Sequence, residues 1–258
     1  MPSVTQRIKE IKQPRGGYVN PRKALKETSL GIVPPHDSKD ESVSPGLVGI
    51  AVDYLTRFMT GTPVREAFDI SYLGASIILE DADFYGKQVT GLDDRSIVAA
   101  IRLAGFDTVY RAGRMTYRPV ELIDPNAATI ENVRAMVESG LKFFEEYGPV
   151  THDGLTFEGA YTDTVQTGDG DFMTADTLWD FNCSVNPPTN KHTLQVVMYW
   201  LMGLHSVHAE EYRAVKRLGF FNPRLGSVYT FDVADIPAET LHEIEVSVIG
   251  YDEGAAIF

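Results

Sequence analysis

The chain has 258 residues, of which 43% are hydrophobic, and a single cysteine, Cys183. One cysteine cannot form an internal disulfide, and it excludes cysteine-rich zinc and iron–sulfur centres. The sequence has no run of eighteen apolar residues and no charged-then-apolar leader. It therefore predicts neither a membrane span nor a signal peptide, and it favours the cytoplasm.

The net charge of −13 is unevenly distributed. Residues 1–40 contain eight Lys or Arg against four acids, so they carry +4, and the remaining 218 residues carry −17. An acidic body repels nucleic acid at long range, because affinity for a duplex depends mainly on neutralising phosphates. Nucleic-acid binding would therefore use a local basic patch, the N-terminal segment or a partner. The alternative is that the acidity only maintains solubility.

The first half of the chain combines an irregular segment with helical patterns. Residues 1–46 are rich in Pro and Gly and lack periodicity, so we expect a basic, extended N-terminal arm that is wrapped on the body or partly disordered. Apolar spacing of about 3.6 then predicts helices over 47–61, 94–105 and 129–147. Thr129 is the expected N-cap of the third helix.

After residue 150 the apolar period changes to 2. We expect strands at 155–161 and 172–183, on either side of the turn-like Gly-Asp-Gly-Asp segment 168–171. A very apolar helix over 192–217, a strand at 228–233 and a helix opened by Pro237 complete the chain. The prediction is an α/β fold, with one mixed domain over residues 47–258.

A few polar residues interrupt the apolar patterns of the predicted hairpin and of the apolar helix. Asp171 is followed nine residues later by Asp180 on the returning strand. Two carboxylates brought together by a hairpin either bind a divalent cation through oxygen or share a proton. Gln195 and Tyr199 lie one turn apart on the helix, where an unpaired amide would cost about 1–3 kcal/mol. The spacing does not fit an EF-hand calcium loop, because no terminal Glu follows.

This pattern resembles the PD-(D/E)xK nuclease superfamily, in its RecB-like and lambda-exonuclease-like branch, where G-x-x-D, D/E-x-K and Q-x-x-x-Y follow one another. The resemblance implies a restriction-endonuclease-like core, a mixed sheet flanked by helices, that hydrolyses DNA with Mg²⁺ or Mn²⁺. It also implies that Asp171, Asp180 and the carbonyl of Phe181 hold the metal. Gln195 and Tyr199 would contact substrate phosphate or orient the hairpin.

Two further positions depend on the same resemblance. Asp53, in Gly49-Ile-Ala-Val-Asp53, stands where RecB-like enzymes place a histidine, and it is a candidate third oxygen ligand. Asn182 stands where the family has its catalytic lysine, and losing such a transition-state donor costs on the order of 3–4 kcal/mol of barrier. Zinc is not expected, because His192, His205 and His208 lack a third ligand at useful spacing.

Three explanations of Asn182 stay open. Lys191, at the start of the next helix, could replace the missing lysine. The domain could be an inactive nuclease fold that acts as a binding or assembly subunit, or Asn182 could be an inactivating substitution. The expected partner is nucleic acid, in particular DNA, and a protein partner or a homo-oligomer is left open.

Overall fold

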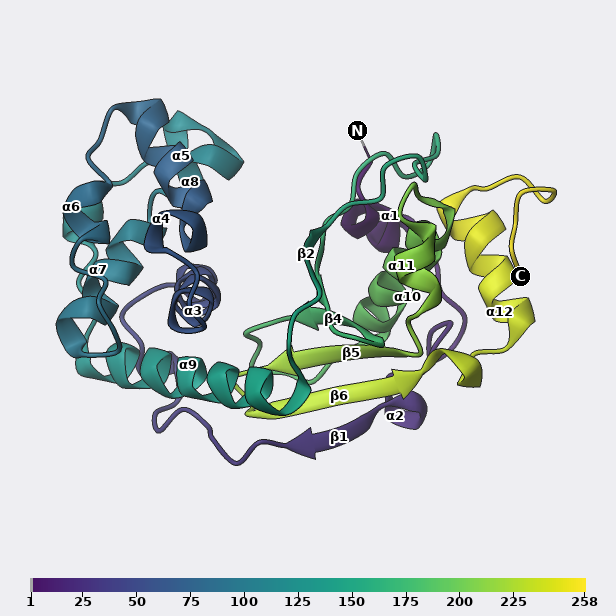
Figure 1. Cartoon of the computed structure of the whole chain (residues 1–258), viewed down its shortest axis with the longest axis horizontal. Coiled ribbons are helices and arrows are strands. Elements are labelled where there is room, and N and C mark those ends of the chain that lie inside the picture. The colour runs from purple at the N-terminus through teal and green to yellow at the C-terminus, as the bar shows by residue number, and fades with distance from the viewer. Residues whose placement is uncertain (1) are drawn as a thin grey trace.

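The computed structural model describes residues 2–258, which form an α/β fold around a mixed six-stranded sheet (Figure 1). The sheet has the order β1-β6-β5-β4-β3-β2. Its parallel pair is β4 with β5, and the other neighbours are antiparallel. The coarse prediction of an α/β fold is therefore confirmed. The strands are β1 (Lys26–Ser29), β2 (His152–Leu155), β3 (Gly170–Met173), β4 (Thr177–Phe181), β5 (Arg217–Asn222) and β6 (Ser227–Asp232).

Helices from the first half of the chain form a lobe beside the sheet, at the left of Figure 1. Their buried apolar side chains make one core, in which α3 packs on α7 and α9. The helices predicted over 47–61 and 94–105 are present as α3 and α7. The lobe contains α3 (Pro45–Met59), α4 (Val64–Ala67), α5 (Asp69–Ile78), α6 (Asp83–Gly86), α7 (Asp94–Ala104), α8 (Asp107–Ala112), two short 3-10 turns (Arg114–Thr116 and Val120–Leu122) and the first part of α9 (Ala127–Tyr147).

Helix α9 connects this lobe to the sheet. It begins two residues earlier than predicted, because Asn126 caps it by accepting a hydrogen bond from the backbone N–H of Thr129 at 2.9 Å. The prediction of Thr129 as the cap was therefore wrong. The far end of α9 lies on the sheet, where Phe143 stacks on Phe221 with ring centroids 4.4 Å apart and meets Trp179 edge-on at 4.9 Å.

The opposite face of the sheet is covered by helices from both ends of the chain. Helix α10 (Asn190–His205) lies over β4 and β5 and is buried along almost its whole length. Its neighbours are α1 (Val4–Glu10), α11 (Ala209–Arg213), α12 (Ala238–Glu243) and the π-helical turn η5 (Ile244–Ile249). The predicted strand at 228–233 and the helix after Pro237 are confirmed as β6 and α12.

Three boundaries differ from the predictions. The strand predicted at 155–161 is wrong, because residues 156–161 form a loop and the strand β2 lies before them, ending at Leu155. The strand predicted at 172–183 is β3 and β4, so the tight turn lies at 174–176 and not at 168–171. The helix predicted over 192–217 ends at His205, because Ser206 adopts an extended backbone conformation, and the separate short helix α11 follows before β5 begins at Arg217.

The N-terminal arm wraps on the body. Helix α1 packs on α10, and β1 pairs with β6 at the edge of the sheet. Helix α2 (Pro21–Ala24) lies between α1 and β1, and the 3-10 turn η1 (Ser38–Asp40) follows β1 before the lobe. The side chain of Glu41, just beyond, is 1% exposed and accepts two hydrogen bonds from Arg224, at 2.7 and 3.1 Å. It also accepts a hydrogen bond from Asn132 of α9, so the arm joins the sheet to the helical lobe.

Candidate metal centre

Asp171 and Asp180 lie opposite each other on the hairpin. Phe172 pairs with Trp179 and Met173 pairs with Leu178, so one step further along the antiparallel register Asp171 meets Asp180. Side chains at directly opposed positions share a face of the sheet, with Cβ atoms about 4.5–5.5 Å apart. The register therefore brings together the two carboxylates that the sequence singled out, on the face of the sheet that α10 covers.

Both carboxyl groups are harder to ionise than usual. Burial raises the pKa of Asp171 well above its ordinary value, and the nearby charges of Asp180 and Asp53 raise it further. One oxygen of Asp171 accepts the backbone N–H of Phe181 at 2.6 Å, which opposes that shift and fixes the carboxylate. Burial raises the pKa of Asp180 to about 6. A pair in this environment gains stability from a proton or from a bound cation.

Gln195 and Tyr199 approach this pair from α10. The amide nitrogen of Gln195 donates to the Tyr199 hydroxyl at 3.0 Å and lies 3.4 Å from a carboxylate oxygen of Asp180. Gln195 therefore faces the hairpin, as expected from the sequence. The Tyr199 ring stacks on Phe157 at 5.2 Å, and burial together with the charge of Asp180 raises its pKa. Tyr199 consequently keeps its proton at neutral pH and can donate a hydrogen bond.

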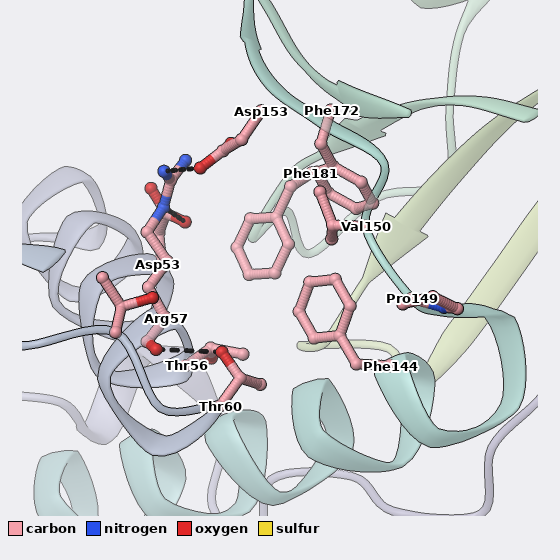
Figure 2. A pocket seen from close by; sticks show the side chains of 11 residues that line it. Asp53, Thr56, Arg57, Thr60, Phe144, Pro149, Val150, Asp153, Phe172 and Phe181 are labelled. Carbon is pink, nitrogen blue, oxygen red and sulfur yellow. Dashed lines mark hydrogen bonds and ion pairs between the residues drawn. The ribbon is translucent and has the colours of Figure 1, made fainter. Parts of the chain in front are cut away.

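Arg57 on α3 is a candidate site residue that the sequence analysis missed. Its Nε lies 3.0 Å from Asp53 and its Nη1 lies 2.8 Å from Asp153 on β2 (Figure 2). Burial alone would lower the pKa of Arg57, but Asp53, Asp153 and Asp171 raise it, so the guanidinium stays charged. Asp53 and Arg57 are four residues apart on a predicted helix, and this spacing could have predicted their ion pair. The contribution of Asp153 could not be seen without the fold.

Four of the sequence-predicted residues line one cavity of about 290 Å³, namely Asp53, Asp171, Phe181 and Asn182. Burial raises the pKa of Asp53, although Arg57 opposes this shift. Cys183 also lines the cavity, and burial raises the pKa of its thiol to about 12. The thiol is therefore protonated at neutral pH, and the cavity presents oxygen ligands rather than a thiolate.

Asn182 and Lys191 are the two residues that bear on the missing catalytic lysine. Asn182 donates its backbone N–H to the carbonyl of Phe221 at 3.0 Å, and its side chain lines the cavity. Lys191 is exposed in the first turn of α10. Within residues 2–258 it forms no ion pair with Asp171 or Asp180.

The donor set fits a hard divalent cation. Within the described part of the chain, no group of three or more His, Cys, Asp or Glu side chains is close enough to hold a metal ion alone. Mg²⁺ commonly takes one or two carboxylates and keeps several waters, so two opposed aspartates and a backbone carbonyl are a sufficient protein contribution. The residues that would hold it are Asp171, Asp180 and Phe181, and Asp53 lines the same cavity as Asp171 and Phe181, whereas Asp180 does not line it.

No protein-family model, curated protein or solved structure matches this chain. Residues 2–258 also contain no helix with both the length and the apolarity that a bilayer crossing requires.

Proposed function

We propose that this protein is a metal-dependent nuclease with a PD-(D/E)xK-type core, which hydrolyses phosphodiester bonds of DNA with Mg²⁺ or Mn²⁺. The observation that supports it most strongly is the opposed pair Asp171 and Asp180, whose carboxyl groups have raised pKa values on a rigid hairpin. Carboxylates carried by paired strands position a cation better than carboxylates on a loop.

Each residue near the pair has a defined task in this proposal. When bound, the divalent cation would lower the pKa of a water molecule and neutralise charge on the phosphate. The Phe181 N–H holds Asp171 in place, and Gln195 orients Asp180. Tyr199, which retains its proton, is placed to donate a hydrogen bond to a phosphate oxygen, either directly or after Gln195 turns toward substrate.

In this proposal Arg57 supplies the positive charge that the family's catalytic lysine would carry. Asn182 can donate a hydrogen bond but carries no charge, whereas Arg57 is held by two carboxylates and its pKa responds to Asp171. A guanidinium cannot act as a base, but it can stabilise the negative charge that develops on a phosphate in the transition state. Lys191 is the other candidate, since it is exposed in the first turn of α10.

A cleavage assay on linear, circular and single-stranded DNA tests this function. We expect Mn²⁺-dependent cleavage by the unmodified chain that Asp180→Asn abolishes, while Asp169→Asn retains it. Asp169 is an exposed aspartate two residues from Asp171, so the control makes the same chemical change beside the site. Loss of cleavage in Lys191→Ala or in Arg57→Gln then identifies which of the two cationic side chains takes part in catalysis. The absence of cleavage by the unmodified chain and by Asn182→Lys would contradict the enzyme proposal.

The second candidate is an inactive nuclease fold that acts as a binding or assembly subunit. Asn182 and the net charge of −13 favour it, because the first removes the family's catalytic charge and the second weakens binding to a duplex. If the subunit candidate is right, Asn182→Lys stays inactive even though Mn²⁺ binds. Restored cleavage in Asn182→Lys would instead show that the rest of the site is competent.

A further inference from the structure

A second, larger cavity of about 460 Å³ lies between α3, the end of α9 and the hairpin. Three aromatic side chains, Phe144, Phe172 and Phe181, form one wall, and Figure 2 shows their rings grouped across from α3. Arg57 and Thr60 of α3 line the other side. The volume is in the range of ordinary small-ligand pockets, and the lining is mainly apolar with a few polar groups at one side.

This aromatic pocket adjoins the candidate metal centre. Asp53 and Phe181 line both cavities. The Phe181 backbone N–H binds Asp171, while its ring contributes to the aromatic wall. Phe181 therefore contacts the carboxylate pair through its backbone and the aromatic pocket through its ring. A ligand that extends from the pair past Asp53 enters this pocket directly.

We propose that the aromatic pocket binds one unstacked nucleobase of the substrate, and that single-stranded nucleic acid is the preferred substrate class. This inference rests on the proposed nuclease function, since it requires the scissile phosphate to lie at Asp171 and Asp180. A base is flat, aromatic and neutral, and it stacks on aromatic side chains whatever its sequence. A duplex would have to break a base pair before it could fill the pocket.

The charges around the pocket favour a neutral group over a second phosphate. Asp53 and Asp153 both line it, and Arg57, the cation among its lining residues, is already paired with both of them. A phosphate placed here would meet two carboxylates for one guanidinium. A base avoids that repulsion, and its stacking compensates for the weak phosphate neutralisation expected of a protein with a net charge of −13.

Removing the base while keeping the charge tests this inference. The full-length protein, with Ca²⁺ in place of Mg²⁺, is titrated into a short labelled oligothymidylate and into the same oligomer made of abasic residues, and fluorescence anisotropy gives both affinities. We expect the intact oligomer to bind on the order of ten- to a hundredfold more tightly, as base–aromatic stacking provides. We also expect it to bind more tightly than the matching duplex.

Variants at Phe144 assign the difference to the aromatic pocket. Phe144 is half-buried and its ring lies 5.4 Å from that of Phe172, so Phe144→Leu retains bulk in the packed core but removes the flat face. We expect Phe144→Leu to reduce the preference for the intact oligomer to within about threefold, and Phe144→Tyr to keep it. Phe84→Leu, at a 61% exposed phenylalanine of α6, is the matched control and should leave the preference unchanged.

The outcomes separate this inference from the proposed function. Equal affinity for the two oligomers, or an unchanged preference in Phe144→Leu, would overturn the base pocket while leaving Mn²⁺-dependent cleavage in place. Failure of both oligomers and the duplex to bind, together with no cleavage, would overturn both proposals. Preferential binding of the intact oligomer without cleavage would support the pocket and the inactive-subunit candidate.

Discussion

Arg57 and Asp153, which both line the aromatic pocket, form an ion pair of 2.8 Å that connects helix α3 to strand β2. The same guanidinium binds Asp53 at 3.0 Å, one turn back on its own helix. The pair therefore places a fixed positive charge where the helical lobe meets the sheet, next to the cavity that Asp171 lines.

Arg57→Gln should separate metal binding from catalysis. Without the guanidinium, cleavage should fall on the order of a hundred- to a thousandfold, because a charged transition-state donor is lost. Mn²⁺ affinity should hold or rise, since a positive charge near three carboxylates has been removed. Calorimetric Mn²⁺ titration and a cleavage assay measure the two effects.

Arg65→Gln is the control, because Arg65 makes a comparable ion pair with Asp83 that is largely exposed. Both cleavage and Mn²⁺ affinity should be unchanged in it. Parallel losses of cleavage and of Mn²⁺ affinity in Arg57→Gln would contradict a catalytic role and point to a structural one.

The metal-free protein should become more stable as the pH falls below neutrality. Asp180 has a folded-state pKa of about 6, above its usual value of 3.8, so its burial destabilises the folded state when it is ionised. That penalty is present above about pH 6 and disappears as the pH falls toward 4. Asp180→Asn should raise the free energy of unfolding at pH 7 on the order of 2–3 kcal/mol and flatten the pH dependence in this window. Urea denaturation in EDTA at a series of pH values measures the free energy of unfolding of both proteins.

Binding to single-stranded DNA should depend only weakly on salt. Each phosphate that a cationic side chain neutralises adds close to one unit to the slope of log affinity against log salt. Arg57 is the cation that lines the aromatic pocket, and it is already paired with two carboxylates. Anisotropy titrations over a range of NaCl should therefore give a slope of about −1 to −2. A slope as steep as that of basic DNA-binding proteins would place binding on the N-terminal arm instead.

The buried pair of Glu41 and Arg224 should be essential for stability. Both side chains are at most 5% exposed, and Glu41 also accepts a hydrogen bond from Asn132. Glu41→Ala leaves a buried guanidinium unpaired, so we expect a loss of about 3–5 kcal/mol in the free energy of unfolding. Asp232→Ala removes the partner of Lys26 in an exposed ion pair and should cost less than about 1 kcal/mol. A loss in Glu41→Ala as small as that in Asp232→Ala would contradict an essential role for the buried pair.

Local patterns in the sequence were sufficient for part of the centre of the fold. The helical period around Asp53 arises from neighbouring residues, so α3 could be predicted, and the alternation around Asp180 predicted strand character there. The turn was expected at 168–171, so the pairing of β3 with β4 that opposes Asp171 to Asp180 was not predicted. The approach of Gln195 to Asp180 also follows from a polar residue in an apolar helix.

Contacts between distant segments could not be predicted in the same way. Strand β1 exists because Lys26 pairs with Thr230 on β6, about two hundred residues away. Strand β5 is a short apolar run whose strand character depends on its parallel pairing with β4. The role of Arg57 depends on Asp153, which reaches it only when β2 joins the sheet. These features arise from the fold as a whole, and no local period encodes them.

Thermal unfolding in the presence of Mn²⁺ tests the central claim that Asp171 and Asp180 form a metal site. A ligand that binds only the folded state at a hundred times its dissociation constant stabilises it by about 2.7 kcal/mol, so Tm should rise by several degrees. Asp169→Asn should keep that rise, and the double variant Asp171→Asn/Asp180→Asn should lose it. An equal rise in the double variant would contradict the claim, as would no rise in the unmodified chain at saturating Mn²⁺.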